Sequence, residues 1–120
     1  MLLRKSGLRM AYNVVIGIPA KRGIQTVANY IAQVLSMPHA ASKLLAAVDT
    51  VVDELEAFPA FRSVDFVISK RIGKEVRHAV VGNYCMYYYI DNSAKTVTIF
   101  SFVHQRQDAT AHVANDFLLI

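Results

Sequence analysis

The chain has 120 residues, of which 54% are hydrophobic and 18% are charged, with a net charge of +4 at pH 7. This composition excludes a disordered chain, and the length fits one globular domain with its own core. No apolar run reaches the ~18 residues of a membrane-spanning helix, and the basic start leads into no signal-length apolar stretch. Cys85 is the only cysteine, which excludes a disulfide framework, so we expect a reducing, cytoplasmic location without export.

Charged residues are unevenly distributed along the chain. Basic residues without acidic neighbours occupy positions 1–22, acidic residues alone occupy 49–56, and basic residues return at 70–77. The pattern predicts one basic and one acidic surface, and a basic surface suits an anionic partner such as nucleic acid. An ordinary solvated surface would give the same pattern. The basic positions are Arg4, Lys5, Arg9, Lys21 and Arg22, and then Lys70, Arg71, Lys74 and Arg77.

The first half of the chain changes from a strand pattern to a helical pattern. Residues 12–18 are apolar and end at Pro19, which predicts a short strand. From Ala20 apolar residues recur at helical spacing, and Ser36 with Pro38 ends this helix and starts another that runs to Pro59. Because the link is short, the two helices are expected to pack as an antiparallel hairpin. The second helix has a wide apolar stripe that includes Leu45, and its deeply buried members are expected to be Leu44, Val48, Val52 and Leu55.

After Pro59 the apolar residues alternate with the period of a strand. Residues 64–68 are expected to form a short strand or an extended segment, and 76–81, 84–90 and 96–104 are expected to form three further strands. Gly82-Asn83 has the composition of a two-residue hairpin turn. In the strand at 84–90, alternation predicts one face with Tyr84, Met86, Tyr88 and Ile90 and another with Cys85, Tyr87 and Tyr89. In the strand at 96–104, it predicts one face with Val97, Ile99, Ser101 and Val103 and another with Thr98, Phe100, Phe102 and His104.

These elements together define the expected architecture. Both faces of the last two strands are largely apolar, which indicates cover on both sides or a concave face that meets a partner. The predicted fold class is α+β: an N-terminal strand and an antiparallel two-helix hairpin packed on a mostly antiparallel sheet of about four strands. We expect residues 1–9 to be an N-terminal extension, 10–108 to be a single domain, and 109–120 to be a tail with a weak helical pattern.

The order of the elements, together with several short motifs, resembles the RelE/ParE family of bacterial toxins from toxin–antitoxin modules. The resemblance covers about residues 11–108. It implies a fold with a strand, a helical hairpin and a three-strand meander. The motifs are Ala28-Asn29-Tyr30-Ile31, Leu55-x-x-Phe58-Pro59, Gly82-Asn83-Tyr84, Tyr87-Tyr88-Tyr89-Ile90-Asp91 and His104-Gln105-Arg106-Gln107-Asp108.

The resemblance implies one of two activities. RelE-like members enter the ribosomal A site and cut mRNA by attack of a ribose 2′-hydroxyl on the adjacent phosphate. ParE-like members bind DNA gyrase and have no cleavage chemistry, and a third alternative is a catalytically silent member that only binds its antitoxin. We favour the ribosome-dependent nuclease. The family also implies a cognate acidic antitoxin as partner, and no cofactor.

A nuclease of this kind needs a base, an acid and cations for the charge that builds on phosphorus. His104 is the candidate acid–base group, because an imidazole titrates near neutrality and this one lies where the last strand runs into a polar segment. Arg77 and Arg106 are candidates for holding the phosphate. Each has an ordinary alternative, since His104 could cap the sheet and the arginines could form surface ion pairs. The candidates for gripping the RNA backbone are Lys70, Arg71 and Lys74.

The sequence departs from the family pattern near its end. The RelE prototype uses a tyrosine near its C-terminus for cleavage, and here no tyrosine follows Tyr89. His104 would then carry more of the proton transfer, in the manner of family members with a C-terminal histidine. The tyrosines at 84 and 87–89 are expected in the core and sheet surface rather than as platforms for base stacking. His39 and His112 have no companions at metal-ligand spacing, so no metal site is expected.

Overall fold

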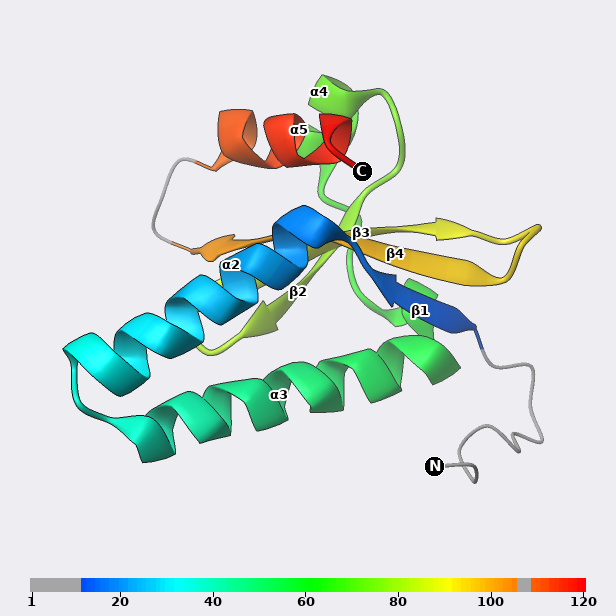
Figure 1. Cartoon of the computed structure of the whole chain (residues 1–120). Coiled ribbons are helices and arrows are strands. Elements are labelled where there is room, and N and C mark those ends of the chain that lie inside the picture. The colour runs from blue at the N-terminus through cyan, green and yellow to red at the C-terminus, as the bar shows by residue number, and fades with distance from the viewer. Residues whose placement is uncertain (1–11, 106–108) are drawn as a thin grey trace.

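The computed structural model describes residues 12–105 and 109–120 (Figure 1). The expected N-terminal extension and Arg106 therefore lie outside the described residues. Four strands form one sheet in the order β1-β4-β3-β2, with β1 parallel to β4 and the other pairs antiparallel. The predicted α+β class with a mostly antiparallel sheet is confirmed. The strands are β1 (Asn13–Ile16), β2 (Arg77–Val81), β3 (Tyr84–Asp91) and β4 (Thr96–His104).

The predicted helical hairpin is present and covers one face of the sheet (Figure 1). It consists of α2 (Ile18–Asn29), which continues as a short π-helix, η1 (Tyr30–Val34), and of α3 (Pro38–Ala57). The helix α2 begins two residues before the expected Ala20. Pro19 lies in its first turn, where a missing backbone N–H removes no helical hydrogen bond.

The other face of the sheet is covered by α4 (Phe66–Ile72) and α5 (Thr110–Leu118), which lie side by side in Figure 1. The expectation of a strand or extended segment at 64–68 is wrong, except for one bridge between Val64 and Arg77. Asp65 caps α4 instead, because its Oδ1 accepts a 3.0 Å hydrogen bond from the Ile68 N–H. Gly73 ends the helix with a φ of 81°, a conformation that glycine adopts without strain.

The 3₁₀-helix η2 (Pro59–Phe61) follows α3, so the chain turns at the proline as expected. Along α3, Val48 and Leu55 are buried at 4% and 0% exposure. The expectation of deep burial is wrong for Leu44 and Val52, which are half-buried, and Leu45 is 43% exposed. The buried stripe is narrower than the apolar stripe of the sequence, because only one side of α3 faces the sheet. Within the described part of the chain, no helix is both long and apolar enough to cross a membrane.

Two clusters of buried side chains lie on the two faces of the sheet. The predicted alternation in β3 is confirmed, because its even-numbered residues from Tyr84 to Ile90 pack toward α2 and α3 and its odd-numbered ones from Cys85 to Tyr89 toward α4 and α5. The first cluster includes Ile24, Val48, Leu55, Met86, Tyr88 and Ile99. The second cluster includes Ile68, Val76, Cys85, Tyr87, Phe100 and Val113.

The predicted alternation in β4 fails after Ile99. Tyr88 pairs with Ile99 and Tyr87 with Ser101, so Phe100 is an extra residue in β4, a β-bulge. Phe100 packs in the cluster under α4 and α5, and Ser101 points the same way, toward α5. After the bulge, the residues of β4 therefore face the opposite side of the sheet from the side that strict alternation predicts.

Candidate functional site

His104 is the last residue of β4 and lies opposite Tyr84, the first residue of β3. The two rings meet edge to face, with centroids 5.2 Å apart and an angle of 76° between their planes. The chain beyond His104 is also held, because the backbone N–H of Gln105 donates a 2.8 Å hydrogen bond to the carbonyl oxygen of Asn83. The β2–β3 turn therefore holds the backbone at the end of β4, from which the imidazole projects.

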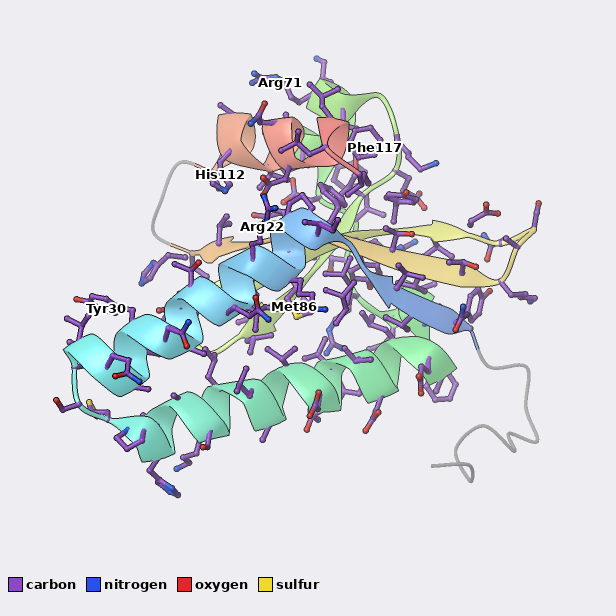
Figure 2. All side chains as sticks on the ribbon, viewed as in Figure 1. Arg22, Tyr30, Arg71, Met86, His112 and Phe117 are labelled. Atoms are coloured by element: carbon purple, nitrogen blue, oxygen red, sulfur yellow. The ribbon has the colours of Figure 1, made fainter. Side chains whose placement is uncertain are left out.

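A cleft of about 680 Å³ opens beside His104, between α2, the end of β4 and α5. It brings His104 together with two groups that the sequence analysis did not connect with it, Arg22 of α2 and His112 of α5. Figure 2 shows Arg22 and His112 on the two neighbouring helices. The polar and aromatic residues that line the cleft are Arg22, Thr26, Tyr84, Phe102, His104, His112 and Asp116. An imidazole pair and a guanidinium in one cleft can move protons and bind an anion.

A glycine lets α2 approach the sheet closely enough to form this cleft. A Cβ atom at Gly23 would lie 2.8 Å from the carbonyl oxygen of Phe102, closer than real Cβ contacts. Phe102 is itself buried and stacks on Tyr84, with ring centroids 5.2 Å apart and planes 14° apart. The close contact of α2 with β4 therefore places Arg22, next to Gly23, over the His104 end of the strand.

The α5 wall of the cleft contains a buried carboxylate. Asp116 is 9% exposed, and its Oδ2 accepts a 2.8 Å hydrogen bond from the hydroxyl of Ser101, which is fully buried. The same oxygen lies 3.4 Å from Nε2 of His112, one helical turn earlier. A buried carboxylate is stabilised by such partners, which also hold it in one orientation. Sequence spacing alone indicates the pair at i and i+4, but not its contact with β4.

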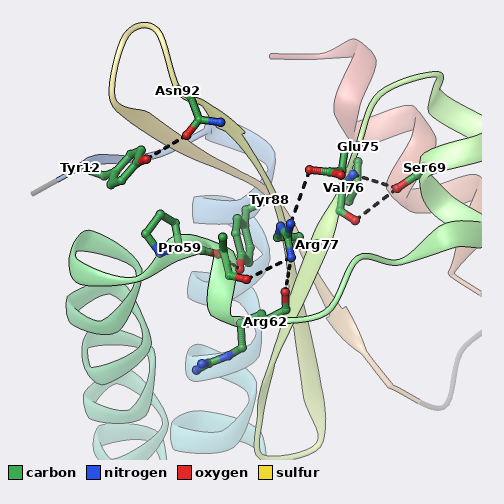
Figure 3. A network of polar contacts seen from close by, with 10 residues as sticks. Tyr12, Pro59, Arg62, Ser69, Glu75, Val76, Arg77, Tyr88 and Asn92 are labelled. Carbon is green, nitrogen blue, oxygen red and sulfur yellow. Dashed lines mark hydrogen bonds and ion pairs between the residues drawn. The ribbon is translucent and has the colours of Figure 1, made fainter.

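Arg77, the expected phosphate ligand, is not among the residues that line this cleft. Figure 3 shows it beside Tyr88 and Arg62. It pairs with Tyr88, whereas His104 pairs with Tyr84, so four residues of β3 separate them, roughly 13 Å along the strand. Its guanidinium donates hydrogen bonds to the carbonyl oxygens of Ala60, at 3.2 Å, and of Arg62. These bonds hold the segment between α3 and α4 against the sheet.

The three other expected cations do not line the cleft and lie in or just after α4, the helix that packs beside α5. Lys70 and Arg71 are in the last turn of α4, and both are exposed. Lys74 follows two residues after α4, with its Nζ 4.7 Å from the ring centroid of Tyr89, a cation–π contact. Together Lys70, Arg71 and Lys74 form a basic surface, which we call the α4 basic surface.

The tyrosines divide between core and cleft. Tyr88 is fully buried and donates a 2.6 Å hydrogen bond to the carbonyl oxygen of Pro59. Burial raises the pKa of Tyr88 and of Tyr87 to about 12. Burial also raises the pKa of the Cys85 thiol, so this cysteine stays protonated and unreactive near neutral pH. Tyr84, half-buried beside His104, is the tyrosine of this strand that lines the cleft.

No group of three or more metal-ligating side chains is present among the residues that the structure describes. His39 lies exposed in the first turn of α3, and His112 contacts Asp116.

Comparisons with known proteins agree with this architecture. The family model for the ParE toxin of the type II toxin–antitoxin system parDE matches residues 16–109. A search of curated proteins gives no match. Among solved structures, the fold is similar to a chain of the toxin–antitoxin complex RelBE2 from Mycobacterium tuberculosis, with 20% identity and a TM-score of 0.51. The similarity covers 79% of this chain and 99% of the other.

Proposed function

We propose that this chain, which belongs to the ParE toxin family of type II toxin–antitoxin systems, inhibits growth by cutting mRNA on the ribosome. The observation that supports this activity is the cleft in which His104 and Arg22 line one cavity. Attack of a ribose 2′-hydroxyl on the adjacent phosphate needs an acid–base group and a cation, and these two side chains are of that kind.

In this proposal each group has a separate role. His104 takes the proton of the attacking 2′-hydroxyl, and Arg22 offsets the charge that builds on the non-bridging phosphate oxygens. Tyr84 offers an aromatic edge of the cleft against which a base can stack. Arg106, two residues after His104, remains a proposed second phosphate ligand. For Arg77 we propose a supporting role, since its guanidinium is already bonded to two backbone carbonyls.

The α4 basic surface is proposed to hold the ribose–phosphate backbone of RNA beyond the cleft. Its residues are exposed and carry three positive charges near α5, which forms one wall of the cleft. Contacts of this kind supply affinity without sequence preference and weaken as salt rises.

The same surface is also the proposed binding site of the antitoxin. Toxins of this family are masked by an acidic antitoxin with a segment that folds on binding, and the structurally similar chain comes from a toxin–antitoxin complex. Acidic side chains would complement Lys70, Arg71 and Lys74, so that the antitoxin and the RNA would compete for one surface.

Inhibition of DNA gyrase without cleavage is the second candidate function. It is favoured by the position of Arg77, which leaves Arg22 as the one arginine at the cleft among the described residues. A toxin that only binds its target does not stabilise charge on a phosphate, so it would not need a second arginine in the cleft.

The two functions are separated by adding the purified protein in parallel to a translating extract and to a gyrase supercoiling assay. We expect cut mRNA in the extract and unchanged supercoiling. His104→Gln should lower the cleavage rate by about 10²–10⁴-fold, the usual contribution of an acid–base group. The matched control is His39→Gln, which removes an exposed imidazole from α3. Inhibited supercoiling with intact mRNA would support the gyrase function, and no effect in either assay would indicate a catalytically silent member.

A further inference from the structure

We propose that His112 is the second acid–base group of the cleft, the general acid that protonates the leaving 5′-oxygen of RNA. This inference rests on the proposed nuclease function and adds a residue to it. Its basis is the contact between α5 and the bulged strand β4, which places a positioned imidazole in the same cleft as His104 and Arg22.

The bulge at Phe100 makes this contact possible. Strict alternation from Ile99 would turn Ser101 toward α2 and α3, whereas the extra residue turns it toward α5. There the fully buried hydroxyl of Ser101 donates its 2.8 Å hydrogen bond to Asp116. β-Bulges commonly re-aim a side chain beside a functional site.

Asp116 in turn orients His112. Its Oδ2 lies 3.4 Å from Nε2 of His112 and also accepts the hydrogen bond from Ser101, so the oxygen that faces the imidazole is itself held in place. A carboxylate beside one ring nitrogen of a histidine fixes the orientation and the tautomer of the ring. The imidazole of His112 is 64% exposed and lines the cleft, so the ring is open to a molecule that binds there.

With His104 as the base and His112 as the acid, every proton in the cleavage of RNA has a donor and an acceptor. His104 accepts the proton of the 2′-hydroxyl while the 2′-oxygen forms a bond to phosphorus. The bond between phosphorus and the 5′-oxygen breaks, and that oxygen takes the proton from Nδ1 of His112. The neutral imidazole of His112 keeps its remaining proton on Nε2, facing Asp116. The products are a 2′,3′-cyclic phosphate and a 5′-hydroxyl, and no cofactor or oxidant is consumed.

A substrate with a better leaving group tests this assignment. The site of cutting is first mapped on ribosomes with natural mRNA, and a second mRNA then carries sulfur in place of the bridging 5′-oxygen at that site. A thiolate leaves without a general acid, so a protein that lacks only the acid should cut the sulfur substrate normally. The variants are His112→Gln, Asp116→Asn and His104→Gln, with His39→Gln as the control, and cleavage is measured in single turnovers.

We expect His112→Gln to cut natural mRNA about 10²–10⁴-fold more slowly than the unmodified protein and to cut the sulfur substrate at nearly the unmodified rate. Asp116→Asn, which removes a positioning residue, should show a smaller loss that sulfur also restores. His104→Gln should be slow on both substrates, because the base is still needed. A merely structural role of the His112–Asp116 pair would slow both substrates equally.

Two outcomes would overturn the assignment of His112. One is a His112→Gln protein that cuts natural mRNA at the unmodified rate. The other is a His112→Gln protein with an unchanged urea midpoint that is equally slow on both substrates, and if that variant fails to fold, the same comparison is made with Asp116→Asn. An unmodified protein that cuts neither mRNA would instead overturn the proposed function itself.

Discussion

The hydroxyl of Tyr88, at the centre of the sheet, donates a 2.6 Å hydrogen bond to the carbonyl oxygen of Pro59, the first residue of η2 (Figure 3). The tyrosine is fully buried, so its hydroxyl has no access to water. Arg77, its partner across the β2–β3 ladder, bonds to the next residues of the same segment. Two neighbouring side chains of the sheet therefore hold the connection between α3 and α4.

Tyr88→Phe should destabilise the protein by about 1–3 kcal/mol, because the substitution leaves a buried carbonyl oxygen without its donor. The midpoint of urea unfolding measures the change. Tyr30→Phe is the matched control, since Tyr30 is 52% exposed and its hydroxyl can bond to water. An equal effect of the two substitutions would show that the Pro59 contact contributes nothing specific.

The two buried tyrosines predict a loss of stability in alkali. Their pKa is about 12 in the folded protein and 10.0 when unperturbed, mainly because burial disfavours the phenolate. The unfolded chain therefore releases these protons first, and stability that is fully present below pH 10 should fall as the pH rises toward 12. Urea unfolding across this range measures the slope. Tyr87→Phe should make the slope shallower, and an unchanged slope would contradict the assignment of the raised pKa to Tyr87.

Shortening single side chains of α3 to alanine should distinguish its buried apolar residues from its exposed ones. Leu55→Ala should cost about 2–5 kcal/mol, because Leu55 is fully buried between the helix and the sheet and the smaller side chain leaves a cavity. Leu45→Ala removes the same atoms from a position that is 43% exposed, and it should cost far less. Equal losses in urea unfolding would mean that Leu45 is buried in solution, for example by self-association.

The elements that could be predicted from the sequence are those governed by local chemistry. Pro38, the Gly82-Asn83 turn and the alternation in β3 each act within a few residues, and each prediction is confirmed. The sequence also contains signals for both ends of α4, because Asp65 and Gly73 are residue types that commonly cap helices. The apolar run between them, however, is also typical of a strand, and this pattern led to the wrong prediction.

The rest depends on contacts between distant segments. The bulge at Phe100 arises from the pairing of β4 with β3, and no local motif indicates it. Arg22, His104 and His112 are widely separated in the sequence, and their meeting in one cleft depends on how α2 and α5 pack on β4. His104 could be selected from its residue type and its place at a strand end, whereas its companions could not.

The α4 basic surface predicts how fast the antitoxin binds. Its three exposed cations should attract an acidic segment over distance, and this attraction raises the association rate more than it slows dissociation. Replacing Lys70, Arg71 and Lys74 by glutamine should slow association several-fold at low salt. The effect should be much smaller near 1 M salt, where the screening length falls to about 3 Å. Stopped-flow mixing with the purified antitoxin at several salt concentrations measures both rates.

The control for this experiment removes the same charge elsewhere. Lys21, Lys43 and Lys95 are exposed on α2, on α3 and at the β3–β4 turn, so their replacement by glutamine also lowers the net charge by three. If the antitoxin binds at the α4 basic surface, this control should slow association less than the first set does, since charge near the encounter site dominates the attraction. Equal slowing by both sets would show that only net charge matters. A rate that is indifferent to salt and to both sets would place the antitoxin on another surface, one that it recognises through apolar contacts.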